Sequence, residues 1–147
     1  MQFRFDYMKT SPEAFQTMLK LEGFIRASGL EPKLYELIKI RASQINGCAF
    51  CINMHTKEAR KMGESEQRIY LLNAWREAPF YTDKERAVLE LTEAVTRISD
   101  NGVSQGLYER VRAHVNEEEY VAIIMAINTI NSWNRLAIST GMHPEQD

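Results

Sequence analysis

Residues 32–63 read PKLYELIKIRASQINGCAFCINMHTKEARKMG, and this stretch predicts two helices joined by a tight turn. Pro32 suits the first position of a helix, and apolar residues follow it at helical spacing. Asn46-Gly47 then provides the left-handed residue with which many helices end. A second helix follows over residues 48–62, with two basic residues in its last turn and Gly63 just beyond it. The stretch therefore predicts an antiparallel helical hairpin.

Helices are also predicted on both sides of this hairpin, and no segment shows the alternation of a strand. Thr82 with Glu85, and Asn116 with Glu119, have the spacing of capping boxes. Ser11 precedes a proline and is expected to cap the first helix through its hydroxyl. The expected helices span residues 12–28, 32–46, 48–62, 65–75, 82–98, 104–114 and 116–139. The sequence thus predicts an all-α fold of about seven helices.

Length and composition predict one domain over residues 1–147. With 44% apolar and 26% charged residues, the chain has the composition of an ordinary globular protein. A chain of this size buries about 70% of its unfolded surface and needs no disulfide or metal to fold. The formal charge of −2, without a cluster of Lys and Arg, argues against a nucleic-acid partner.

The longest apolar run, Val121–Ile127, is far shorter than the roughly 20 residues that a membrane-spanning helix needs. Residues 1–9 also lack the apolar core of a signal peptide. We therefore expect a cytoplasmic protein without a membrane partner. Because the run is apolar on all sides of its helix, this helix is either central or covered by another subunit, and self-association is favoured.

Polar side chains follow this run on the same helix. Asn131, Asn134 and Arg135 continue a stripe that begins with apolar residues. Such groups more often bond to neighbouring helices or to another subunit than to a substrate. We expect structural hydrogen bonds from them.

The chain has two cysteines, Cys48 and Cys51, at the start of the third expected helix. In a reducing compartment this spacing indicates catalytic, redox or metal chemistry rather than a structural disulfide framework. One inward face of the helix is expected to carry Cys48, Cys51, Ile52, His55, Ala59 and Met62. Both thiols lie in the first turn, where the helix dipole favours a thiolate, and their separation permits a cycle between dithiol and disulfide.

Two other interpretations of the pair remain open. Buried cysteines and a hydrogen-bonded core histidine are common in proteins without any redox role. The two thiols and His55 could also hold zinc, but a structural zinc site needs a fourth ligand. The remaining histidines, His114 and His143, lie far along the chain without a paired spacing. We therefore expect redox chemistry, with no metal ion and no organic cofactor.

The spacing of the site residues is similar to that of a known family. Glu36 is followed after 11 residues by Cys48-Ala-Phe-Cys51, then after three residues by His55, with Gly63 downstream. This motif, residues 36–55, resembles the core of the alkylhydroperoxidase D-like proteins of the carboxymuconolactone decarboxylase superfamily. Similarity to small members of that group continues in Trp75-Arg-Glu-Ala-Pro, in residues 85–87 and in residues 131–135.

The resemblance implies an all-helical homo-oligomer, often a trimer or hexamer, that reduces a small-molecule hydroperoxide. It implies that Cys51 attacks the peroxide, that Cys48 resolves the sulfenate, and that Glu36 and His55 form a proton relay. A dithiol or protein reductant, which the sequence does not specify, would complete the cycle. Phe50 stands where the best-characterised peroxidases of this kind have a histidine.

Two arguments about Glu36 disagree. By periodicity it shares a polar stripe with Lys39 and Ser43, which predicts a solvated surface acid. In an antiparallel hairpin, however, Glu36 lies about 15 Å and His55 about 12 Å from the turn, at 1.5 Å per residue. Together with the resemblance, this common level predicts contact between Glu36 and the His55 region.

The position of His55 also predicts which thiol attacks. The helix dipole acts most strongly on Cys48, but it contributes only about 0.3 to 1 kcal/mol. His55 lies one turn from Cys51 and two turns from Cys48, and a positioned general base contributes roughly 3 to 5 kcal/mol. We therefore expect Cys51 to be the nucleophile.

The sequence predicts a thiol-dependent peroxidase, and two alternatives remain, one a second enzymatic activity and the other a non-enzymatic function. A lactone decarboxylase of the same superfamily is less favoured because its chemistry has no use for a dithiol. A non-enzymatic redox sensor or scaffold, whose dithiol only controls assembly, would be oxidised once by stoichiometric peroxide and would then stop, even with excess dithiol reductant. Multiple turnover with excess reductant separates the peroxidase from the sensor.

Overall fold

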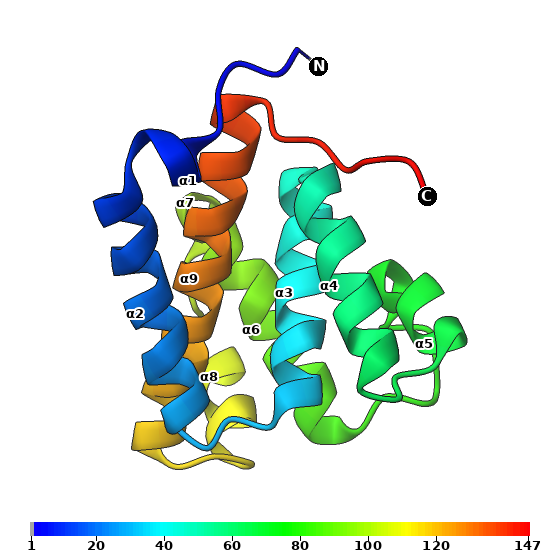
Figure 1. Cartoon of the computed structure of the whole chain (residues 1–147). Coiled ribbons are helices and arrows are strands. Elements are labelled where there is room, and N and C mark those ends of the chain that lie inside the picture. Colours follow the sequence, from blue (N-terminus) through cyan, green and yellow to red (C-terminus); the bar gives the residue numbers. More distant parts are fainter. Residues whose placement is uncertain (1) are drawn as a thin grey trace.

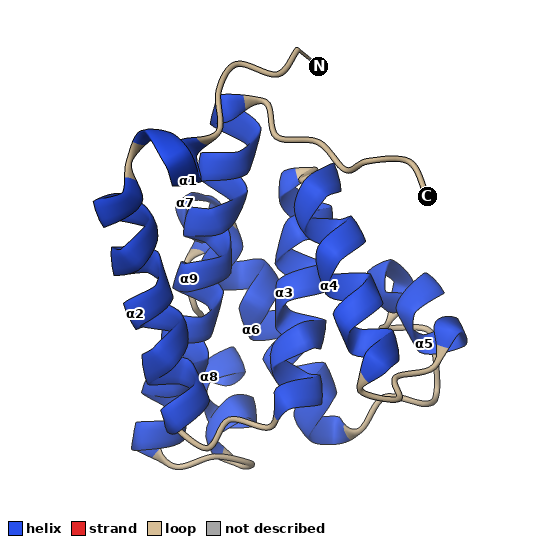
Figure 2. Ribbon diagram, in the orientation of Figure 1, coloured by secondary structure: helices blue, strands red, loops and turns tan. Residues whose placement is uncertain are grey.

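A computed structural model of the chain describes residues 2–147 and shows helices connected by short loops (Figures 1 and 2). The helices are α1 (Tyr7–Thr10), α2 (Pro12–Ala27), α3 (Pro32–Asn46), α4 (Ala49–Lys61), α5 (Glu66–Tyr70), α6 (Asp83–Thr96), α7 (Ile98–Asn101), α8 (Gln105–Arg112) and α9 (Glu117–Thr140). A 3₁₀ helix, η1 (Leu72–Ala74), follows α5. Residues 2–147 contain no strand, so the predicted all-α fold is confirmed.

The number of helices differs from the predicted seven. Two single-turn helices, α1 and α7, are too short to give a periodic signal, and the predicted helix 65–75 is divided into α5 and η1. The cysteine motif therefore starts the fourth helix rather than the third. The expected Ser11 cap is also wrong, since its hydroxyl makes no capping bond to α2, and its backbone N–H closes α1 on the carbonyl of Tyr7.

The predicted end of α3 and the predicted starts of α6 and α9 are confirmed. Both capping boxes are present, with Thr82 and Glu85 at α6 and Asn116 and Glu119 at α9. Gly47 ends α3 with φ 69°, a left-handed conformation that a residue with a Cβ adopts only with strain. This turn folds α4 back along α3.

Helix α3 lies at the centre of the fold. It packs against α4, α6 and α9, and α9 in turn packs against α2 (Figure 1). As a result α3 is buried on nearly every side, including its polar residues Glu36, Lys39 and Ser43. The solvated stripe expected from periodicity is therefore wrong, because neighbouring helices cover the side that periodicity marked as polar.

Asparagines connect α3 to α9. The Asn46 side-chain amide donates to Oδ1 of Asn131 and to Oδ1 of Asn134, both at 2.9 Å, and the Asn134 amide donates to the Ser43 hydroxyl at 2.9 Å. These bonds confirm the structural role expected for the two α9 asparagines. Within residues 2–147, no helix is long and apolar enough to cross a membrane.

We expect the chain to self-associate. Most of the run Val121–Ile127 is buried against other helices of the same chain. Val121, however, remains 54% exposed, and Ile124 and Met125 are only partly covered. Burial of such surface between copies is favourable by about 25 cal/mol per Å². Light scattering at micromolar concentration should report at least a dimer. A uniform species of 17.0 kDa would contradict the prediction.

Candidate active site

The two cysteines lie at the N-terminus of α4 and are joined by a disulfide, with their Cα atoms 5.3 Å apart. Cys48 is the N-cap residue, and its sulfur accepts a hydrogen bond from the Cys51 backbone N–H at 3.3 Å. Both side chains are buried and pack with Ala137 of α9. The predicted dithiol/disulfide pair therefore has the geometry for its oxidised form.

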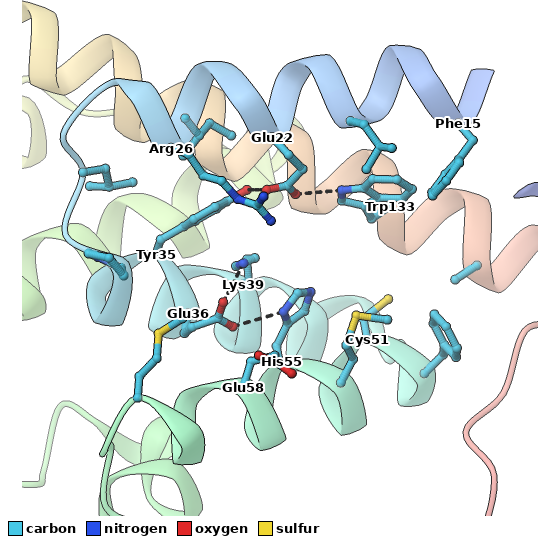
Figure 3. Close-up of a pocket in the computed structure, with 18 of the residues that line it drawn as sticks. Phe15, Glu22, Arg26, Tyr35, Glu36, Lys39, Cys51, His55, Glu58 and Trp133 are labelled. Atoms are coloured by element: carbon cyan, nitrogen blue, oxygen red, sulfur yellow. Dashed lines mark hydrogen bonds and ion pairs between the residues drawn. The ribbon is translucent and has the colours of Figure 1, made fainter. Parts of the chain in front are cut away.

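A cavity of about 660 Å³ lies beside the disulfide, between α2, α3, α4 and α9 (Figure 3). Cys51, His55 and Glu36 line it, whereas Cys48 does not. Much of the remaining wall is apolar and includes Phe15, Leu19, Ile25, Leu30, Phe50 and Met54. A molecule in this cavity would therefore contact Cys51 and not Cys48.

Glu36 and His55 are in direct contact across the hairpin. The Nδ1 atom of His55 lies 3.1 Å from Oε2 of Glu36, and the Glu36 side chain is only 5% exposed. The contact predicted from the common level of the two residues and from the family resemblance is therefore present. Of the four predicted site residues, the structure joins Cys48 to Cys51, pairs Glu36 with His55, and places Cys51 beside the same cavity as that pair.

Electrostatics determine which ring nitrogen of His55 carries a proton. Burial raises the pKa of Glu36, but the hydrogen bond from His55 and the charge of Lys39 outweigh it, so the pKa lies below its usual value. An ionised carboxylate can only accept hydrogen bonds, so the proton of a neutral His55 is on Nδ1. Nε2 has no hydrogen-bond partner among residues 2–147 and is left as the acceptor at the cavity wall.

Several residues beside the cavity were not found by sequence reasoning. Nζ of Lys39 lies 2.7 Å from Oε1 of Glu36 and 3.9 Å from the centre of the Tyr35 ring. The Tyr35 hydroxyl donates to Glu22 at 2.8 Å, and the Trp133 indole N–H donates to the other Glu22 oxygen at 2.9 Å. Burial, and then the Glu22 carboxylate, raise the pKa of Tyr35. The i,i+3 spacing of Glu36 and Lys39 was the available signal, but it also fits an exposed ion pair.

The chemical state of the cysteines can be measured on purified protein. No group of three His, Cys, Asp or Glu side chains within residues 2–147 is arranged to hold a metal ion. We expect protein purified without reductant to contain the Cys48–Cys51 disulfide and no stoichiometric metal. Elemental analysis that found one zinc per chain, with thiols protected from alkylation until a chelator is added, would refute the redox interpretation.

Comparisons with known proteins agree with the geometry. The profile described as "Carboxymuconolactone decarboxylase family" matches residues 12–94. The uncharacterized protein YdfG of Bacillus subtilis is 51% identical over 96% of both chains. The alkyl hydroperoxide reductase AhpD of Acidobacterium capsulatum is 36% identical over 46% of this chain and 37% of its own length.

A solved structure is also similar along its whole length. It is a protein of unknown function from Agrobacterium tumefaciens, provisionally named as the antioxidant defence protein AhpD. It is 49% identical, has a TM-score of 0.94, and the match covers 99% of this chain and 100% of the other. On the profile match and the near full-length relatives, this chain belongs to the carboxymuconolactone decarboxylase family.

Proposed function

We propose that the protein is a thiol-dependent peroxidase that reduces organic hydroperoxides through Cys51 and Cys48. The observation that carries this proposal is the cavity, where Cys51 meets the open space beside the His55–Glu36 pair while its disulfide partner Cys48 is kept out of it. A nucleophile next to an oriented base is the arrangement that thiol catalysis requires.

The cycle uses this chain's own residues in three steps. Nε2 of His55 takes the Cys51 thiol proton, and the thiolate attacks the terminal oxygen of ROOH. The O–O bond breaks, RO⁻ receives the proton from His55 and leaves as ROH, and Cys51 becomes a sulfenic acid. The Cys48 thiolate then attacks the Cys51 sulfur, the S–S bond forms, and hydroxide leaves with the Cys48 proton as water. An external dithiol reduces the disulfide by exchange and is itself oxidised to a disulfide.

The size and lining of the cavity favour a substrate with an apolar body. Cys51 and Met62 both line it and are 11 residues apart on α4 and its C-terminal end, about 16 Å at 1.5 Å per residue. Hydrogen peroxide would leave most of this apolar wall unused. We therefore infer that an aryl or alkyl hydroperoxide is bound more tightly, because each buried CH₂ group contributes about 0.8 kcal/mol.

Multiple-turnover peroxide consumption tests the proposal. With cumene hydroperoxide and excess dithiothreitol, many equivalents of peroxide should be consumed per chain, and kcat/KM should exceed that for hydrogen peroxide. We also expect the enzyme to work as a cytoplasmic homo-oligomer without metal or organic cofactor. Oxidation of one equivalent followed by arrest, although reductant is in excess, would identify a redox sensor instead.

A further inference from the structure

Lys39 is a buried cation for which the proposed catalytic cycle has no role. Its side chain is only 9% exposed, and it lies on α3 one turn after Glu36. A lysine is rarely buried unless its charge is paired, because removal of an ammonium group from water is costly. The ion pair with Glu36 and the contact with the face of the Tyr35 ring offset this cost for Lys39.

The two oxygens of Glu36 are divided between two donors. Oε1 accepts from the Lys39 ammonium at 2.7 Å, and Oε2 faces Nδ1 of His55 at 3.1 Å (Figure 3). A proton on Oε1 would turn the contact with Lys39 into one between two donors, and a proton on Oε2 would require Nδ1 of His55 to give up its own proton and would leave the Lys39 ammonium against a neutral acid. The contact with Lys39 therefore disfavours a protonated Glu36 in each step of the cycle.

From this geometry we propose that Lys39 is a positioning residue that keeps Glu36 ionised, so that Glu36 orients His55 without itself carrying the proton. The inference rests on the proposed peroxidase function and changes the proton relay that the sequence predicted. The relay expected from the sequence would pass the proton through both His55 and Glu36. With Lys39 in place, the proton moves from Cys51 to Nε2 of His55 and from there to the leaving oxygen, and Nδ1 keeps its own proton throughout.

Of the permanently charged cations that line the cavity, Lys39 is the one that contacts Glu36 directly. Lys39 and Tyr35 approach from α3, His55 and Glu58 lie on the α4 side, and Glu22 and Arg26 face the cavity from α2. Glu58 is paired with Lys61, and Glu22 accepts from Tyr35 and Trp133. Burial raises the pKa of Glu36, whereas the hydrogen bond from His55 and the charge of Lys39 lower it.

Removal of the Lys39 charge should make Glu36 titrate within the working pH range. A charge within about 4 to 6 Å shifts a carboxyl pKa by about 1 to 3 units. In Lys39→Met the acid limb of kcat should therefore move up by about two units, so that the ratio of kcat at pH 6 to kcat at pH 8 falls by up to about fourfold below wild type. KM should change little. Lys39→Arg should keep the wild-type profile, and so should Lys33→Met, which removes an exposed lysine from the same helix.

A second measurement does not depend on turnover. The ¹³C signal of the Glu36 carboxyl carbon, assigned by its loss in Glu36→Gln, should remain that of a carboxylate from pH 5.5 to 8.5 in wild type. It should titrate in that range in Lys39→Met. If the methionine variant does not fold, Lys39→Gln, which keeps a donor without the charge, takes its place in both measurements.

The outcomes separate this inference from the proposed function. Absence of wild-type turnover would refute the peroxidase proposal, while the carboxyl titration would still decide the role of Lys39. A wild-type pH profile in the charge-removal variant, with Glu36 still ionised, would overturn the positioning role and leave Lys39 as a structural residue. Titration of Glu36 between pH 5.5 and 8.5 in wild type would also overturn it.

Discussion

Cys51→Ser is expected to abolish peroxide reduction, whereas Cys48→Ser should retain the first chemical step and stop after it. The thiolate is the reactive form of cysteine, and a serine hydroxyl is not ionised under the same conditions. Only Cys51 of the pair lines the cavity, and His55 lies one helical turn away from it. Loss of an activated nucleophile of this kind should lower the rate by about 10³-fold or more.

The two variants are matched controls for one another, since neither can form the disulfide. With one equivalent of cumene hydroperoxide and a sulfenate trap, mass spectrometry of Cys48→Ser should locate the adduct on Cys51. His55→Ala should slow this step by about 10² to 10⁴-fold, the usual contribution of a general base. A fast phase retained in Cys51→Ser, with the adduct on Cys48, would reverse the assignment and remove the proposed role of His55.

Glu36→Ala should lower the free energy of unfolding by roughly 3 kcal/mol at pH 7. The substitution leaves the Lys39 ammonium buried without its carboxylate, and the loss of one partner of a buried ion pair typically costs about 3 to 5 kcal/mol. We expect the lower end because the neighbouring cavity can admit water to the freed ammonium. Urea denaturation at pH 7 measures the change, and Glu31→Ala is the control, since Glu31 is exposed and its side chain caps nothing.

The loss should depend on pH in a definite direction. The folded-state pKa of Glu36 lies below its usual value of 4.5, because the His55 hydrogen bond and the Lys39 charge outweigh the effect of burial. The ionised carboxylate therefore stabilises the fold above about pH 4.5, and this stabilisation is lost as the pH falls through the folded-state pKa. The difference in the free energy of unfolding between wild type and Glu36→Ala should therefore be smaller at pH 3 than at pH 7. If the two proteins differed in stability by the same amount at pH 7 and at pH 3, this role of the ionised Glu36 carboxylate would be contradicted.

Local signals in the sequence were sufficient to predict the helices and the hairpin. Gly47 could be assigned to a helix end because few other residues adopt its backbone conformation without strain. The capping boxes of α6 and α9 depend on residues only three positions apart, so they could also be found without the tertiary structure. The common level of Glu36 and His55 followed from counting residues to either side of the turn, and the contact between them was predicted from this level together with the family resemblance.

Burial by neighbouring helices could not be predicted in the same way. Helix α3 has the polar stripe of a surface helix, but α4, α6 and α9 enclose it, and Lys39 becomes a buried cation. Whether a polar side chain is solvated depends on helices that are distant in sequence, and a helical period contains no information on which helix packs where. The same limit applied to the apolar run Val121–Ile127, most of which is buried against other helices of the same chain.

The sequence alone determined the helical hairpin, the Cys-X-X-Cys pair at a helix start and the level at which Glu36 meets His55, because all of these depend on spacing within 20 residues. The tertiary structure alone decided that Cys51 and not Cys48 lines the cavity, and that Lys39 holds the free oxygen of Glu36. The physical reason is that α2 and α9 complete the cavity from opposite ends of the chain. Both helices are far from the cysteine motif in sequence, and they come next to it only when the chain folds.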